Sequence, residues 1–275
     1  MKTIHARPAV VLALTLAILM APVLGGGTAA AEQFDATHAG YDRLLKAVVA
    51  GGRVDYARLL ADPGALDEYL QSAAGVTEAR FDAWPENQRL AFLLNLYNAA
   101  TLRLILDHYP LESIKQIGGL FKGPWDQPVV GLFGRRITLD TLEHDILRKR
   151  YREPRIHMAL VCAAKGCPAL RQEAYVAERL NAQLDDQARR YLNSAAGLRI
   201  ARGQGVVYFS AIFKWFGDDF RALYDPPRGF DGLTPVQRAV ANFCASYLPQ
   251  PEREYLAQGG YDVRYLPYDW SLNAK

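Results

Sequence analysis

The feature that most constrains the fold is a long apolar stretch between two prolines, Pro85 and Pro110. Residues 82–86, DAWPE, are typical of a helix start, because proline suits the first helical position and acids favour the positive end of the helix dipole. The helix should run to about His108, with Pro110 closing it. Its apolar residues cover most of its faces. The sequence therefore predicts a central helix that other elements surround.

The first 31 residues have the features of a secretory signal. Lys2 and Arg7 give a positive start, residues 9–24 are almost wholly apolar, and Ala29-Ala30-Ala31 offers the small-x-small pattern of a cleavage site. The alternative is a retained membrane anchor, but the apolar run is shorter than the ~20 residues that a spanning helix needs. We therefore expect cleavage near Ala31, an exported protein that is periplasmic or secreted, and no stable membrane insertion afterwards.

The remaining residues, 32–275, carry a balanced charge. The whole chain has 32 Lys and Arg against 29 Asp and Glu, so removing Lys2 and Arg7 leaves 30 against 29 and a net charge of +1. Without a basic block, this composition gives no reason to expect nucleic-acid binding. The segment is long enough for a large apolar core and has no internal repeat or low-complexity linker. We predict one globular domain over 32–275.

Hydrophobic periodicity predicts further helices and a few short strands. The predicted helices cover residues 34–49, 56–71, a segment after Asp140, residues 174–192, a short helix capped by Ser210 and a helix from Thr234. The predicted strands are a pair within 125–138, the segment 155–162, a hairpin within 198–209 and the tail 261–270. Asp140, with Glu143 three residues on, has the spacing of a capping box. The sum is an α+β fold, a mostly helical single domain with a small antiparallel or mixed sheet.

The stretch RIHMALVCAAKGCPAL, residues 155–170, carries one histidine and two cysteines, which a buried strand rarely needs for packing. Pro168 would place Cys167 at the cap of a helix, where the dipole lowers the pKa of a thiol. Cys167 is therefore the predicted nucleophile of an exported thiol-dependent hydrolase or acyl transferase. Its predicted partners are His157 or His144 as the base, and Glu143, Asn95 or Asn98 as the group that orients the base.

A disulfide between Cys162 and Cys167 is the main alternative, because oxidising compartments keep cysteines paired. It would staple a non-catalytic binding or scaffold domain. A redox-active pair is a weaker alternative, since the spacing is not Cys-x-x-Cys. A zinc site is a still weaker alternative, since the sequence has only one close pair of candidate ligands. We predict no metal and no cofactor, and we expect a small-molecule or peptide ligand. Cys244, on the apolar face of a late helix, is predicted to be a buried thiol.

The polar candidates also have structural interpretations. His157, on a covered strand, would be a hydrogen-bonded core residue, because buried polar groups are almost always paired. Asn95 and Asn98 would tie the central helix to loop backbone. The large aromatic residues Trp125, Trp215 and Trp270 are predicted to belong to the core, in preference to a carbohydrate platform.

Several segments together resemble one family of bacterial proteins. They are VDY at 54–56, FLLNLYNAATL at 92–102, TLDTLEHDILR at 138–148, RIHMALVCAAKGCPAL at 155–170, SAIFKWFGDDF at 210–220 and YDWSLN at 268–273. On these segments the chain resembles domain of unknown function 547 (DUF547), in its exported bacterial members. The resemblance implies a single exported domain and brings no particular reaction.

Overall fold

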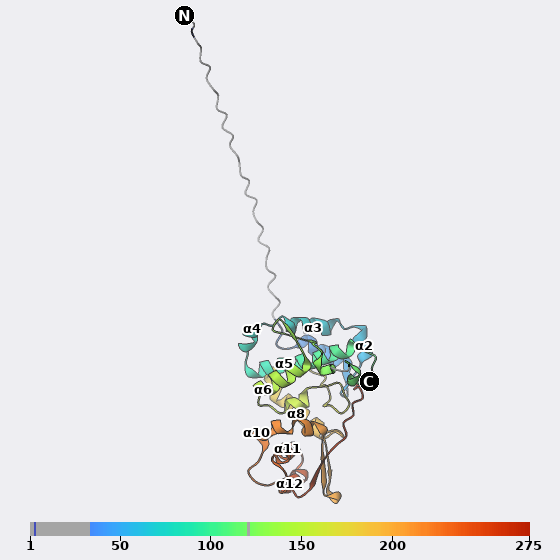
Figure 1. Cartoon of the computed structure of the whole chain (residues 1–275), viewed down its shortest axis with the longest axis vertical. Helices are drawn as coiled ribbons and strands as arrows, with labels where there is room; N and C mark the ends of the chain where they lie inside the picture. The colour runs from blue at the N-terminus through green and yellow to red at the C-terminus, as the bar shows by residue number, and fades with distance from the viewer. Residues whose placement is uncertain (1–2, 4–33, 120–121) are drawn as a thin grey trace. The chain divides into compact units, whose positions relative to one another are not determined.

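Helix α5 (Glu86–Leu106) runs through the interior, as its apolar composition predicts (Figure 1). Every side chain from Leu90 to Leu102 on it is buried, so the helix has no solvent-facing side over this length. Pro85 lies at its N-cap, and Pro110 follows its end. The prediction of a central helix is therefore confirmed.

The computed structural model describes residue 3, residues 34–119 and residues 122–275. The predicted signal segment and its cleavage site lie outside the described residues, apart from residue 3. Residues 34–275 form one compact unit. Among the residues that the structure describes, no helix combines the length and the apolarity needed to cross a bilayer.

The elements that surround α5 come mainly from the first two thirds of the chain. They are α1 (Ala39–Val48), β1 (Val49–Ala50), β2 (Arg53–Val54), α2 (Tyr56–Ala61), α3 (Gly64–Ala74), α4 (Glu78–Asp82), the short turns η1 (Ile114–Gln116) and η2 (Pro124–Asp126), the antiparallel pair β3 (Val130–Leu132) and β4 (Arg135–Ile137), the π-helix η3 (Thr141–Leu147), α6 (Arg148–Arg150) and α7 (Ile156–Ala159). Their apolar faces and α5 share one hydrophobic cluster.

The last third of the chain builds a second hydrophobic cluster beside the first. Its elements are η4 (Ala177–Arg179), α8 (Leu180–Leu192), β5 (Leu198–Ala201), η5 (Arg202–Gln204), β6 (Val206–Phe209), α9 (Ala211–Phe216), η6 (Gly217–Phe220), α10 (Arg221–Tyr224), α11 (Pro235–Ala245), α12 (Gln250–Gln258) and β7 (Asp262–Tyr265). Strand β6 pairs antiparallel with β5 and parallel with β7. The predicted hairpin is confirmed, and four residues of the predicted tail strand form β7.

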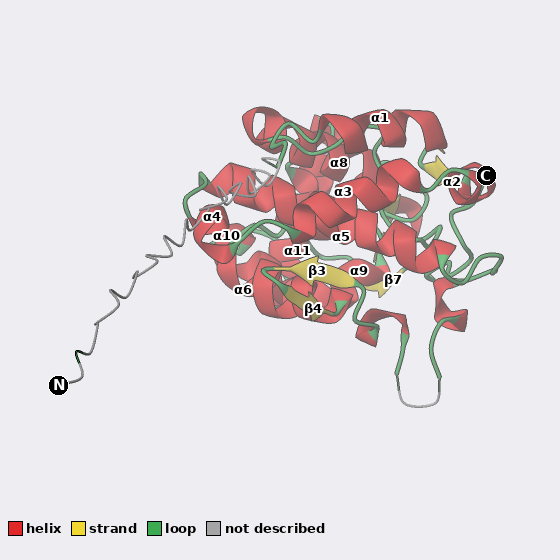
Figure 2. Cartoon of the chain, turned by 90° about the horizontal axis from the view of Figure 1, so that it is seen from above, coloured by secondary structure: helices red, strands yellow, loops and turns green. Residues whose placement is uncertain are grey.

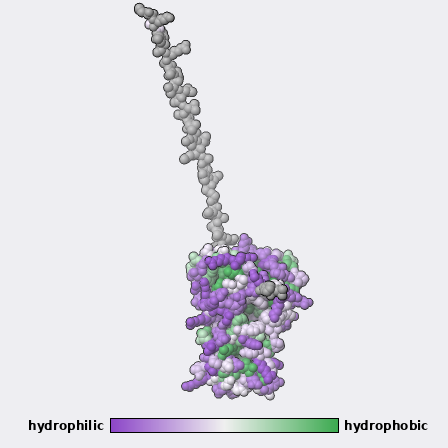
Figure 3. Space-filling view, viewed as in Figure 1, coloured by the Kyte–Doolittle hydropathy of each residue, from purple (hydrophilic) through white to green (hydrophobic). Residues whose placement is uncertain are grey.

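The predicted fold class is confirmed: the described residues are mostly helical, with sheets of two or three short strands (Figure 2). The cap predicted for Ser210 is present, and the helix predicted from Thr234 is capped by that residue, since each side chain accepts a hydrogen bond from an amide in the first turn of its helix. The face seen in Figure 3 is mostly hydrophilic, with small apolar patches, as expected for a domain whose apolar residues fill its interior.

The predicted strand at 155–162 is wrong. Residues Ile156–Ala159 form the single helical turn α7. The extended segment after it forms hydrogen bonds with a side chain, where a strand would form them with a neighbouring strand. Asn98 on α5 donates from Nδ2 to the carbonyl of Ala159 and accepts at Oδ1 from the amide of Val161, at 3.0 and 2.9 Å. One buried amide therefore supplies the donor and the acceptor that a strand partner would give.

Two predicted helix starts are also wrong. The helix predicted over 174–192 begins at Leu180, after the turn η4, because residues 174–176 are extended and bond to side chains of α5 and α8. Asp140 forms no capping box, since it already has helical dihedral angles and its side chain caps no amide. The hydroxyl of Thr138 accepts from the amide of Thr141 in its place, at 3.0 Å.

Candidate functional site

A cleft of about 370 Å³ brings together side chains from distant parts of the chain. Its walls come from α5, η2, η3, α7, α9, the loop after α7 and the C-terminal tail. Four of the predicted catalytic residues, Cys167, His157, His144 and Glu143, line it. Cys162 lines it as well. The structure therefore gathers most of the predicted site residues around one cavity.

The C-terminal tail reaches this cleft because it lies along the cysteine loop, residues 162–167. The amide of Gly166 donates to the carbonyl of Asp269 at 2.8 Å. A Cβ atom on Gly166 would lie 2.8 Å from the amide nitrogen of Asp269, so only glycine permits this approach. The contact places the hydroxyl of Tyr268 2.9 Å from Sγ of Cys162.

Cys162 and Cys167 are free thiols, so the predicted disulfide is not formed in the structure. Their sulfur atoms lie 2.9 Å apart, within hydrogen-bond distance and beyond the ~2.05 Å of a bond. Cys162 is partly exposed and Cys167 is buried. Ala163, between them, has a left-handed φ of 59°, which residues other than glycine rarely adopt. Cys244 is fully buried in α11, as predicted.

The surroundings of the two thiols separate their acidities. The hydrogen bond between the Cys162 and Cys167 thiols lowers the pKa of Cys162, and the hydrogen bonds with the Tyr268 hydroxyl and the Ala164 amide lower it further, while burial and Glu143 oppose them. Burial raises the pKa of Cys167, and the neighbouring Cys162 raises it again. Cys162 is therefore the first of the pair to become a thiolate.

The predicted basis for activating Cys167 is wrong. No helix begins at Pro168, since the described chain from there to Val176 is irregular and the next turn is η4. Without a helix end there is no dipole to lower the pKa of Cys167. Among the described residues, neither sulfur is hydrogen-bonded to an imidazole, and the sulfurs bond to each other, to Tyr268 and to backbone groups.

His157 is held rigidly in the floor of the cleft. Only 3% of the residue is exposed, and its ring stacks on Phe216 with 4.3 Å between centroids. Its Nε2 atom lies 2.8 Å from Oδ2 of Asp219. Arg148 also binds Asp219, through two hydrogen bonds of 2.6 and 2.8 Å. Although burial opposes them, the hydrogen bonds from His157 and Arg148 lower the pKa of Asp219 below its usual range.

His144 is more open to the cleft and linked to the same group. Its Nδ1 atom lies 2.8 Å from Nη1 of Arg148, and its Nε2 atom lies 3.5 Å from Oδ1 of Asp140. An arginine can only donate, so Nδ1 must accept. A neutral His144 therefore carries its proton on Nε2, which makes it a hydrogen-bond donor in this arrangement.

Glu143 is buried at the edge of the cleft and accepts a hydrogen bond at Oε2 from the hydroxyl of Tyr97, at 3.0 Å. Burial, followed by the charge of Glu143, raises the pKa of Tyr97 far above its usual value, so Tyr97 remains a donor. Glu143 does not orient either histidine through a hydrogen bond among the described residues. It contributes a carboxylate beside the thiols.

Asn95 and Asn98 have the structural role that the sequence predicts. Asn95 bonds to both the carbonyl and the amide of Tyr175, at 2.8 and 2.9 Å. Asn98 makes the equivalent pair of bonds to the segment after α7. Both amide groups are therefore committed to backbone. Neither side chain is among those that line the cleft.

The family of the central part of the chain follows from comparison with known proteins. Residues 81–192 match the model of the family described as "protein of unknown function, DUF547". This segment is a DUF547 domain. Comparison with curated proteins and with solved structures gave no match. The resemblance that we infer outside the matched residues, at 54–56, 210–220 and 268–273, stays a prediction.

The DUF547 segment supplies both thiols, both histidines and Glu143 to the cleft, while later residues supply Asp219 to His157 and Tyr268 to Cys162. Sequence reasoning missed both of these later partners, Asp219 and Tyr268. Asp219 and Tyr268 both lie in segments that resemble DUF547, at 210–220 and 268–273. This resemblance is the only feature of the sequence that pointed to them. Spacing gives no such signal, because Tyr268 is 106 positions from Cys162.

The prediction that three tryptophans belong to the core is wrong for Trp215, while Trp125 and Trp270 are partly buried and pack against the core. Trp125, Trp215 and Trp270 all line the cleft, and Trp215 is 46% exposed. Trp270 is the shared partner, with ring centroids 6.0 Å from Trp125 and 5.9 Å from Trp215. Tyr268 packs on Trp270 at 4.5 Å. These rings form an aromatic wall of the cleft, which we call the indole wall.

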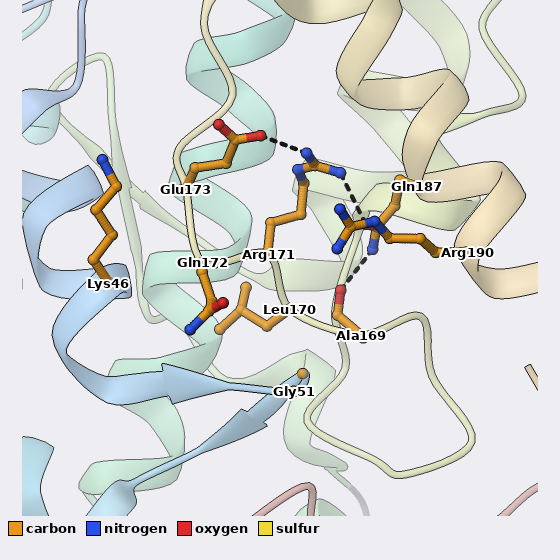
Figure 4. Close-up of a pocket in the computed structure, with 10 residues that line it drawn as sticks. Lys46, Gly51, Ala169, Leu170, Arg171, Gln172, Glu173, Gln187 and Arg190 are labelled. Atoms are coloured by element: carbon orange, nitrogen blue, oxygen red, sulfur yellow. Dashed lines mark hydrogen bonds and ion pairs between the residues drawn. The ribbon is translucent and has the colours of Figure 1, made fainter.

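A larger hollow of about 550 Å³ lies between α1, the β1–β2 turn and α8, and Figure 4 shows its residues. Neither Cys162 nor Cys167, the candidate nucleophiles, lines this hollow. Its charged groups are already paired: Arg171 with Glu173 and Asp186, Lys46 with Asp42, and Arg190 with Asp186. Among the described residues, no three His, Cys, Asp or Glu side chains are grouped to hold a metal ion. The cleft at Cys162 is therefore the better candidate site.

Proposed function

We propose that this chain is an exported thiol-dependent hydrolase or acyl transferase whose nucleophile is Cys162. The observation that carries the proposal is the set of hydrogen bonds around one sulfur. Sγ of Cys162 lies 2.9 Å from both the Cys167 sulfur and the Tyr268 hydroxyl, and its pKa is lowered. The thiolate is the nucleophilic form of cysteine. A partly exposed thiolate in a cleft is suited to attack a bound carbonyl carbon.

This arrangement does not need a histidine to remove the thiol proton. In a cysteine–histidine pair, the imidazole takes that proton and the two groups must be in hydrogen-bond reach. Here two donors, Cys167 and Tyr268, stabilise the charge after the proton has left for solvent. The backbone amide of Ala164 contributes as a third donor. The histidines then serve to shape the cleft and to donate hydrogen bonds.

The proposed reaction proceeds in two steps through a thioester. The sulfur of Cys162 forms a bond to the acyl carbon, and the leaving group departs with its electron pair and takes a proton from water. A second water, or another acceptor, then attacks the thioester and Cys162 leaves as a thiolate. We assign Glu143, whose carboxylate lines the same cleft, as the group that receives the proton of the attacking water.

Export is the second part of the proposal, and the N-terminal sequence supports it. The basic start, the apolar run and the small residues before Glu32 form the pattern of a cleaved signal. Sequencing the N-terminus of the protein purified from fractionated cells tests this part. We expect a new terminus near Glu32 in the exported fraction. An intact Met1 in every fraction would contradict it.

Trapping of an acyl-enzyme tests the proposed reaction. Purified protein is mixed with a panel of activated esters, thioesters and peptide amides, quenched in acid and analysed by intact mass and peptide mapping. We expect an acyl adduct on Cys162 and turnover that is lost in Cys162→Ser. Cys244→Ser is the matched control, because that thiol is sealed in α11. Turnover that persists in Cys162→Ser, or an adduct confined to another residue, would overturn the assignment.

A non-catalytic binding domain is the second candidate, and the absence of a sulfur–imidazole hydrogen bond among the described residues favours it. In that case the cleft binds a ligand against the indole wall and carries out no reaction. It predicts quenching of tryptophan fluorescence by a ligand without any adduct on Cys162. An acyl adduct that forms and turns over would exclude it.

A further inference from the structure

The charged residues of the cleft are all of one sign. Of the described residues that line it, Asp126, Asp140 and Glu143 carry carboxylates, and none is lysine or arginine. The thiolate of Cys162 adds a further negative charge when it forms. A cleft lined by one sign of charge attracts ligands of the opposite sign and disfavours ligands of its own.

The nearby cations do not balance the three carboxylates of this cleft. Arg148 forms two hydrogen bonds to the carboxylate of Asp219. Lys115 lies over Trp270, with its Nζ atom 3.8 Å from the ring centroid. The indole wall therefore already binds one alkylammonium group of the protein. The contact between Lys115 and Trp270 is a cation–π interaction, in which a positive charge is attracted to the face of an indole ring.

The indole wall leaves aromatic surface uncovered beside the carboxylates. Trp215 is 46% exposed, although its ring contacts both Tyr268 and Trp270. The exposed part of this ring adds to the aromatic surface that lines the cleft. Aromatic faces next to carboxylates form the kind of site that recognises alkylammonium ligands. The cleft volume of about 370 Å³ is that of a site for a small molecule or one end of a peptide.

We propose that the cleft selects substrates in which the acyl group or its leaving group carries a positively charged alkylammonium. The ammonium would lie against Trp215 and near Asp126 and Asp140, and the carbonyl would reach Cys162. This inference rests on the proposed function, since it names the substrate class of the same site. Anionic substrates are disfavoured by the three carboxylates and the thiolate.

Two thiol reagents of opposite charge test the inference without any substrate. The cation is 2-(trimethylammonium)ethyl methanethiosulfonate, and the anion is 2-sulfonatoethyl methanethiosulfonate. In each case the Cys162 thiolate attacks the reagent sulfur, a disulfide forms and methanesulfinate leaves. Intact mass gives the rate at which unmodified protein disappears. We expect the ratio of cation to anion rates to exceed the ratio for 2-mercaptoethanol by roughly 10- to 100-fold at low salt, and to fall as salt is added.

Matched variants assign the selectivity to the cleft. The double variant Asp126→Asn/Asp140→Asn should bring the rate ratio close to that of 2-mercaptoethanol. Asp62→Asn removes an exposed carboxylate that does not line the cleft and should leave the ratio unchanged. Trp215→Leu should slow the cationic reagent more than the anionic one. A double variant that keeps the full selectivity would overturn the inference.

A binding measurement gives an independent readout. In Cys162→Ser, which has no reactive thiol in the open part of the cleft, choline should quench tryptophan fluorescence, and its uncharged analogue 3,3-dimethylbutan-1-ol should not. Equal binding of the two compounds would contradict the inference. Equal rates with the two charged reagents, together with an acyl adduct on Cys162, would overturn the substrate class alone. Failure of Cys162 to react with either reagent would overturn the proposed function as well.

Discussion

Asp219 accepts a hydrogen bond from Nε2 of His157 at 2.8 Å, although the two residues are 62 positions apart. The same carboxylate binds Arg148, which in turn donates to His144. One acid therefore fixes the positions of both histidines in the cleft. Its lowered pKa reflects these donors and keeps it ionised across the neutral range.

Replacing Asp219 by asparagine should destabilise the domain, because Arg148 then lies partly buried without its counter-charge. We expect a loss of roughly 1–3 kcal/mol in the free energy of unfolding at pH 7, measured with urea. The pKa of Asp219 is lower in the folded state than its value of ~4 in the unfolded chain. The stabilisation by Asp219 is therefore complete above pH ~4 and is lost as the pH falls further. Asp218→Asn, an exposed neighbour, is the control. Equal stability of wild type and Asp219→Asn at pH 7 would contradict the assignment.

Replacing Asn98 by alanine should be more costly, because it leaves a buried carbonyl and a buried amide without partners. Each such group costs about 1–3 kcal/mol, so we expect the free energy of unfolding to fall by roughly 2–5 kcal/mol. Asn87→Ala, at an exposed position of the same helix, should change it by no more than about 0.5 kcal/mol. Similar chemical-denaturation midpoints for the two variants would show that Asn98 does not hold the segment after α7.

Local patterns were sufficient to predict the central helix, the hairpins and the fold class, and they missed the short helices α4, α7 and α12. Helix α5 was predictable because its apolar periodicity and its flanking prolines act over neighbouring residues. The segment 155–162 was not, since a strand and an extended chain bonded to a side chain share the same apolar composition. What distinguishes them is Asn98, which lies on a helix more than 60 positions earlier.

The candidate site was predictable in part of its membership and not in its connections. The residue types of 155–170 marked the thiols and His157, and the cleft contains them. The choice between Cys162 and Cys167 depends on Tyr268, which reaches the cleft only because the tail bonds to Gly166. A contact between segments so far apart follows from the three-dimensional packing, and no spacing rule contains it.

His38 should make the stability of the domain depend on pH in the mildly acidic range. Burial lowers the pKa of His38 to about 4, against 6.5 in its ordinary state, and Asp35 opposes this only in part. Between these values the unfolded chain binds a proton that the folded chain does not, so stability falls as the pH drops from ~6.5 to ~4, by up to about 3 kcal/mol. Urea unfolding at pH 7 and pH 5 measures the change. His38→Asn, which tolerates the left-handed φ of 54°, should flatten it. A wild-type profile as flat as that of His38→Asn would contradict this account.

Oxidation should inactivate the site by joining its two thiols. Their sulfurs are 2.9 Å apart, so a small movement is enough for a bond. Diamide, which takes up two electrons and two protons, should lower the intact mass by two hydrogens and abolish alkylation of Cys162 until reductant is added. Cys167→Ser should not form this product. A wild-type mass that is unchanged, under conditions that oxidise a small dithiol, would contradict the pairing.

The pH dependence of Cys162 alkylation tests the central claim most directly. Iodoacetamide rates are measured by peptide mapping from pH 5 to pH 10 on reduced wild type, Cys167→Ser, Cys167→Ala and Tyr268→Phe. We predict a wild-type midpoint below the ~8.5 of an ordinary thiol. Relative to wild type, the midpoint should rise in Cys167→Ala and in Tyr268→Phe. It should rise less in Cys167→Ser, because the serine hydroxyl keeps a hydrogen-bond donor. A wild-type midpoint at or above ~8.5, or a Cys162 that reacts only after unfolding, would contradict the account.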